Sequence, residues 1–106
     1  MKVRVDTIRE IAANKICTLL SRSEIKDLVD LRELLASGVA LDAAIDDGAK
    51  RDGGVDAASL AWVLDELSIG PTARLPGGVD PVALEAFRAD LVTRLRAIAF
   101  EHARKM

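Results

Sequence analysis

The sequence has few of the residues from which metal and catalytic sites are most often built. Its 106 residues include one cysteine, Cys17, one histidine, His102, one tryptophan, Trp62, two phenylalanines and no tyrosine. A single cysteine excludes an internal disulfide and a multi-cysteine zinc site, and a single histidine excludes a multi-histidine metal site. With so few aromatic residues, the core must consist of Leu, Ile, Val and Ala, which suits closely packed helices.

The chain also lacks an excess of charge and a long apolar run. Its 15 Lys and Arg residues against 17 Asp and Glu give a formal net charge of -2, which gives no sign of generic binding to nucleic acid or to an anionic membrane. No apolar run approaches the roughly 18 residues of a membrane span, and the first ten residues lack the apolar region of a signal peptide. We therefore expect a cytoplasmic protein without a membrane segment.

Helix start and stop signals predict an all-α fold, a small bundle of about five helices in one domain over residues 1–106. Val3–Val5 is read as a short edge strand, and Thr7 with Glu10 forms a capping box for the first helix. Ser23, Asp56 and Asp80 are the expected N-caps of later helices, the last followed by Pro81, and Gly38 ends the second helix. The expected helices cover about 8–20, 24–36, 41–50, 57–67 and 81–104 (the last within a segment 80–105), with a loop over 69–78.

Two charged residues lie on helix faces that are otherwise apolar. At about 100° per residue, Lys15 falls near the middle of the apolar arc of the first helix. Asp27 projects from the apolar face of the second helix, with Asp30 at its edge. The short hinge over 21–23 predicts an antiparallel hairpin, which brings Lys15 towards Asp27 or Asp30. Two interpretations stay open: a structural ion pair that fixes the hairpin register, or a charged cluster that meets a ligand.

The segment Val5–Leu31, VDTIREIAANKICTLLSRSEIKDLVDL, resembles the C-terminal motif region of the AbiEii/AbiGii-type nucleotidyltransferase toxins of type IV toxin–antitoxin systems. In that family a short strand precedes a helix that carries a Lys, followed by an Arg and by an R/K-D-x-x-D-L segment. The matching residues here are Lys15, Arg22, Lys26-Asp27 and Asp30-Leu31. The detailed resemblance covers about a quarter of the chain, within a motif hairpin over residues 3–37.

The resemblance implies transfer of nucleotides from an NTP with Mg²⁺, with RNA such as tRNA as the target in some members. It implies that Lys15 faces the triphosphate, that Asp27 or Asp30 completes the polar pocket, and that Arg22 and Lys26 add positive potential. These five residues are the candidate nucleotide-binding residues.

The family's catalytic core has a Gly-Gly or Gly-Ser turn followed by a D-x-D carboxylate pair, and no such motif precedes Val3. Gly53-Gly54 followed by Asp65-Glu66 imitates it, but adjacent residues of a helix point in different directions. We therefore expect a truncated, non-catalytic C-terminal helical fragment, with no cofactor or catalytic residue of its own. The alternative is a small interaction module that forms a homodimer or binds an antitoxin or a separate core domain.

Three further features are interpreted as structural rather than functional. Trp62 is expected in the core with its Leu neighbours, and Cys17 is expected to be a small buried apolar residue. The basic residues of the last helix interleave with Glu85, Asp90 and Glu101, which favours a mixed solvated face over a basic stripe for RNA.

Overall fold

The computed structural model describes residues 5–72 and 74–104 of the chain and is all-α in those ranges. The predicted helices are present, and their bounds agree with the expected ones within a few residues. The structure has α1 (Val5–Arg22), α2 (Ile25–Ala36), α3 (Leu41–Arg51), α4 (Ala57–Glu66), a 3₁₀ turn η1 (Pro76–Gly78) and α5 (Pro81–Arg104).

The N-terminal prediction was wrong in part. Helix α1 begins at Val5, so Val5 is helical rather than extended, and Thr7 lies inside the helix instead of capping it. Val3 and Arg4, the remainder of the expected edge strand, lie outside the described residues.

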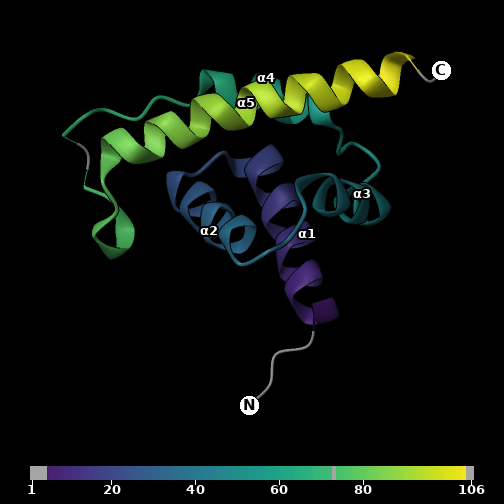
Figure 1. Ribbon diagram of the computed structural model, residues 1–106, viewed down its shortest axis with the longest axis horizontal. Coiled ribbons are helices and arrows are strands. Elements are labelled where there is room, and N and C mark those ends of the chain that lie inside the picture. The colour runs from purple at the N-terminus through teal and green to yellow at the C-terminus, as the bar shows by residue number, and fades with distance from the viewer. Residues whose placement is uncertain (1–4, 73, 105–106) are drawn as a thin grey trace.

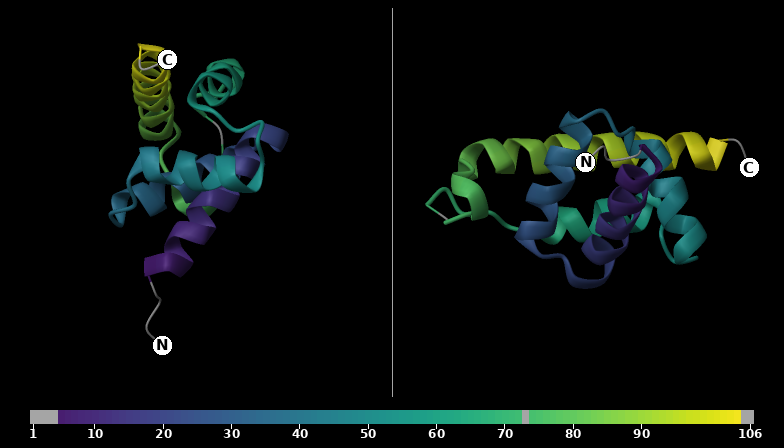
Figure 2. Two further views of the ribbon diagram at one scale, coloured as in Figure 1. Left: turned by 90° about the vertical axis from the view of Figure 1, so that its right-hand side faces the viewer. Right: turned by 90° about the horizontal axis from the view of Figure 1, so that it is seen from below.

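The helices form two layers. Helix α5 lies across the top of the molecule in Figure 1 with α4 beside it, and the left view of Figure 2 shows these two helices side by side above α1, α2 and α3. Figure 1 also shows that α5 runs in the direction opposite to α4, whose C-terminal end leads into the long connection 67–80. Within the described ranges, no helix has the length and apolarity needed to cross a membrane.

Helices α1 and α3 pack closely because a glycine faces the contact. A Cβ at Gly48 would lie 3.1 Å from Ile16 Cγ2 and 3.4 Å from Val55 Cγ1. The two helices run in the same direction. Arg9 of α1 contacts Asp47 of α3, and Asn14, further along α1, contacts Arg51, further along α3. The missing side chain at residue 48 therefore sets the distance between these two helices.

The buried core consists of aliphatic side chains and alanines, as the low aromatic content predicted. Its largest fully buried apolar members are Ile16, Leu19, Leu28, Leu31, Leu60, Leu64, Leu84, Leu91 and Leu95. The prediction for Trp62 was wrong, because its side chain is 68% exposed on α4. Ile11 of α1 is also exposed, at 41%. Cys17 is partly buried against the core.

Most of the predicted caps hold. Asp56 accepts a hydrogen bond from the backbone N–H of Ser59 at 2.7 Å, and Asp80 accepts one from Val82 at 3.2 Å. Gly38 ends α2 with a φ of +113°, a conformation that favours glycine. Ser23 does not cap α2. It has a φ of +56°, and both its backbone N–H and its hydroxyl donate to Leu19 O, so it terminates α1 instead.

Candidate functional site

Four of the five predicted site residues meet where α1 packs against α2. We call Lys15, Arg22, Asp27 and Asp30 the Lys15 cluster. Only two residues separate the helices, so the chain turns back on itself, and residues late in α1 face residues early in α2. The contacts of Arg22 with Asp27 and of Lys15 with Asp30 follow this order. The expected approach of Lys15 to Asp27 or Asp30 is therefore confirmed for both carboxylates.

Asp27 is the buried centre of the cluster. Its side chain is completely buried, and it is the only buried charged residue in the part of the chain for which burial is described. Nη2 of Arg22 donates to its two carboxylate oxygens at 3.2 and 3.1 Å, and Lys15 Nζ lies 3.5 Å from Oδ1. A buried carboxylate is tolerated when charged donors satisfy its oxygens, as they do here.

Lys15 has its shortest contact with the other carboxylate. Its Nζ lies 2.8 Å from Asp30 Oδ2, and the Asp30 side chain is 51% exposed whereas that of Lys15 is 26% exposed. The hydrogen bond to Asp30 raises the pKa of Lys15 above its ordinary value of 10.5, against the opposing effect of burial. Lys15 therefore carries a fixed positive charge at neutral pH, close to the surface.

Lys26 does not join the cluster. Its ammonium lies 3.6 Å from Glu24, and both side chains are about half exposed. Its position on α2, one residue before Asp27, directs it away from the side that faces α1. Sequence position next to a cluster residue was thus a poor guide to its location.

The carboxylates of the cluster are bound by cations. Mg²⁺ needs carboxylate oxygens that are free to bind it, and here Arg22 and Lys15 occupy the oxygens of Asp27 while Lys15 also holds Asp30. Among the described residues, no group of three or more His, Cys, Asp or Glu side chains is placed to hold a metal ion. The amine of Lys15, in contrast, is a point charge of the kind that binds phosphate oxygens.

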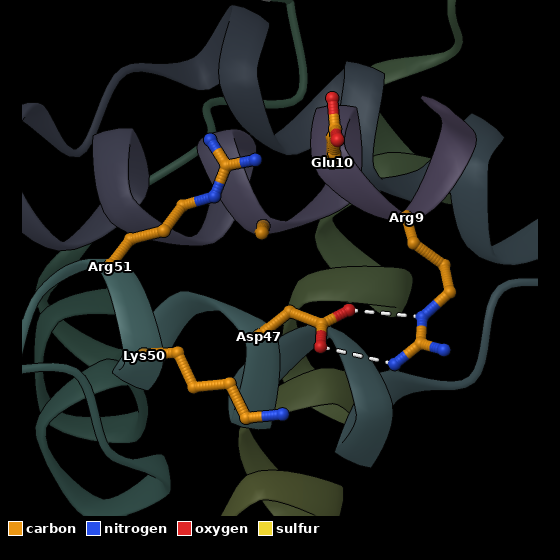
Figure 3. A pocket seen from close by; sticks show the side chains of 6 residues that line it. Arg9, Glu10, Asp47, Lys50 and Arg51 are labelled. Atoms are coloured by element: carbon orange, nitrogen blue, oxygen red, sulfur yellow. Dashed lines mark hydrogen bonds and ion pairs between the residues drawn. The ribbon is translucent and has the colours of Figure 1, made fainter. Parts of the chain in front are cut away.

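A second charged region, not found from the sequence, lies in a groove between α1 and α3. Figure 3 shows Arg9, Asp47, Lys50 and Arg51 around this groove, which has a volume of about 380 Å³. Arg9 donates to both oxygens of Asp47 at 3.0 Å, and Arg51 donates to the side chain of Asn14. These partners are 37 and 38 residues apart in sequence, so only knowledge that α1 packs on α3 could have revealed the groove.

A comparison with protein families decides what the chain is related to. The model described as "Nucleotidyl transferase AbiEii toxin, Type IV TA system" matches residues 1–106. The chain belongs to this family. The match extends the resemblance from the motif hairpin to all five helices, so α3, α4 and α5 are also part of the AbiEii sequence pattern. No match was found among curated proteins or among solved structures.

Proposed function

We propose that this chain forms the helical side of a nucleotide-binding pocket in an AbiEii nucleotidyl transferase, with Lys15 contacting the triphosphate. Mg²⁺ and the NTP belong to the family reaction, and the carboxylates that hold the metal would come from outside the Lys15 cluster. In this view the chain alone binds nucleotide weakly and does not transfer it, and RNA such as tRNA is the class of acceptor.

The observation that carries the proposal is the unequal sharing of Asp27. Arg22 already supplies two hydrogen bonds to this buried carboxylate, whereas Lys15 is the more distant partner and binds chiefly to exposed Asp30. A phosphate that takes the place of Asp30 on Lys15 would leave the buried pair intact. Phosphoryl transfer depends on such fixed positive charges beside the phosphates.

We propose that this chain does not transfer nucleotides because its carboxylates are already bound by Arg22 and Lys15. Two-metal phosphoryl transfer uses carboxylates that hold two Mg²⁺ ions beside the attacking and leaving oxygens. Asp27 and Asp30 are bound by cations instead, so they are better placed to position Lys15 than to hold metal.

The proposal is tested by titrating the full chain with each of the four NTPs in the presence of Mg²⁺, using calorimetry. We expect weak binding that Lys15→Ala reduces at least tenfold and Lys15→Arg reduces less. Lys50→Ala is the matched control, since it removes one exposed lysine from α3 and should leave binding unchanged. Equal losses in both alanine variants would show only a general effect of charge.

Transfer is measured separately, with labelled NTPs, Mg²⁺ and bulk tRNA. We expect no labelled RNA from the chain alone. Labelling that Lys15→Ala abolishes would support the nucleotide contact and refute the non-catalytic part of the proposal. Absence of any Lys15-dependent nucleotide binding would refute the contact itself.

A further inference from the structure

The outer face of α5 carries a stripe of apolar and small side chains along most of its length. At about 100° per residue, positions three or four apart share one side of a helix. All of the residues on this stripe are exposed: Val82, Ala86, Ala89, Thr93, Ala97 and Phe100. The stripe points away from Leu84, Leu91 and Leu95, which bury the opposite face of α5 in the core. It spans about 27 Å at 1.5 Å per residue.

Large apolar side chains are exposed at the two ends of the stripe. Val82 and Phe100, at its two ends, are 61% and 65% exposed. At its centre, the hydroxyl of Thr93 donates to Ala89 O in its own helix at 3.2 Å, so the methyl group is left to contact a partner. In Figure 2, none of the described helices lies over this outer side of α5.

The order of residues along the stripe fits a second copy of itself in the antiparallel direction. Turning one copy by 180° sets Val82 against Phe100, Ala86 against Ala97 and Ala89 against Thr93. The two inner pairs consist of alanine and threonine, which lets two helices approach closely at the centre, and the outer pairs join Val82 to Phe100 at each end.

The charges beside the stripe fit the same arrangement. Asp90 and Arg94 lie on one flank, both exposed, and neither forms an ion pair within the described part of the chain. The register that pairs Ala89 with Thr93 brings Asp90 of one copy to Arg94 of the other, twice by symmetry. On the other flank, Glu85 and Arg96 already pair with Arg88 and Asp65 of the same copy. Opposite charges of the two copies therefore meet along the Asp90 edge.

We propose that α5 pairs with α5 of a second copy of this chain, antiparallel, through the stripe from Val82 to Phe100. This surface is separate from the Lys15 cluster, so the proposal does not depend on nucleotide binding. Because the stripe contains several small side chains, we expect a weak dimer, with a dissociation constant on the order of micromolar.

Trp62 lies where such a dimer can be observed. It stands one helical turn before Asp65 on α4, and Asp65 is paired with Arg96 of α5 at 3.3 Å. Since α4 and α5 are antiparallel, the step from Asp65 back to Trp62 leads towards the Phe100 end of the stripe. Val82 of the second copy would then arrive beside Phe100 and Trp62. Trp62 is the only tryptophan, so its fluorescence reports this contact alone.

The first experiment measures mass by sedimentation equilibrium and Trp62 emission over a range of concentrations of the full chain. We expect a monomer–dimer equilibrium and a blue shift of Trp62 emission as the dimer forms. Ala89→Glu places a carboxylate at the centre of the stripe on an exposed helical site, so the monomer should fold normally and remain monomeric. Ala36→Glu, an exposed alanine of α2, is the control and should dimerise as before. A wild-type chain that stays monomeric up to about 1 mM, or a dimer unaffected by Ala89→Glu, overturns the proposal.

A second experiment tests the direction and register. Arg94→Asp sets like charges opposite each other at two symmetric places, and we expect it to raise the dissociation constant about tenfold. The exchange Asp90→Arg with Arg94→Asp restores the opposite pairing and should return the constant to near the wild-type value. Failure of the exchange to restore dimerisation overturns the antiparallel register.

Discussion

Removing the charge of Asp27 should destabilise the fold far more than removing the charge of its neighbour Asp30. Asp27→Asn replaces one carboxylate oxygen by an amide that can only donate, in a place where Arg22 and Lys15 also donate. The variant therefore loses one accepted bond and the charge that strengthens the others. Asp30→Asn changes a side chain that is half exposed, where water can replace the lost interaction.

The magnitude follows from what each change leaves behind. Stranding a fully buried charge costs about 3–5 kcal/mol, but neither Arg22 nor Lys15 is stranded here. The Arg22 side chain is 47% exposed, and Lys15 keeps Asp30 as its partner at 2.8 Å. We therefore expect Asp27→Asn to cost about 2–3 kcal/mol, between a stranded charge and a surface pair, and Asp30→Asn to cost less than about 1 kcal/mol. For a chain of this size the first value corresponds to a fall in Tm on the order of 10–15 °C.

Urea denaturation followed by far-ultraviolet circular dichroism measures both variants against the wild type, at equal chain concentration because association also stabilises. Arg22→Ala, alone and combined with Asp27→Asn, completes a double-mutant cycle, and we expect a coupling energy of about 1–2 kcal/mol. If Asp27→Asn costs no more than Asp30→Asn, then the buried contact with Arg22 does not hold the hairpin together.

Two further predictions concern α3 and α5. Gly48→Val should cost about 2–3 kcal/mol in urea denaturation, because its side chain would be forced against Ile16 and Val55, whereas Gly53→Val, at an exposed turn with open space around it, should cost less. The hydrogen bond from Arg88 lowers the pKa of Glu85 below its ordinary value of 4.5, so this pair stabilises the fold above pH 4.5 and the contribution is lost as the pH falls through the lower folded-state value. Glu85→Gln should therefore be less stable than the wild type near neutral pH and equally stable in acid; a stability difference that persists unchanged into acid would contradict the assignment.

Local signals predicted the helices well because their ends depend on short-range chemistry. Asp56 and Asp80 cap from side chains two or three residues away from the N–H groups they accept from, and Gly38 supplies a conformation that few other residues adopt. Ser23 shows the limit of this reasoning. The same hydroxyl can cap the helix that follows or bind the last turn of the helix that precedes, and the tight connection between α1 and α2 selects the second.

Trp62 was misplaced because α4 offers no single apolar face. Apolar residues occupy almost every position from Ala57 to Val63, so their spacing does not reveal which side is covered. The neighbouring helices decide this, and they cover the side of Leu60 and Leu64. The Arg9–Asp47 pair was missed for a related reason, since it depends on which helices are neighbours.

Helix geometry predicted the part of the candidate site whose residues interrupt an apolar face. Lys15 and Asp27 were conspicuous because each interrupts an apolar face, and the short hinge indicated that the faces meet. Arg22 had no such signal, since it lies at the exposed end of α1, and only the family motif pointed to it. Lys26 belonged to the same motif, yet the structure pairs it with Glu24 outside the cluster.

The structural interpretation of the Lys15 cluster applies to its inner pair, and the phosphate contact that we propose would use its outer pair. Asp27 and Arg22 form the inner pair, in which a completely buried carboxylate must keep a cation. Lys15 and Asp30 form the outer pair, where the carboxylate is exposed and water can take its place. An anion that displaces Asp30 from Lys15 therefore costs the fold little, whereas one that displaced Asp27 would expose the core of the hairpin. This division would let the hairpin retain its register while the ammonium of Lys15 exchanged Asp30 for a phosphate, as the proposed contact requires.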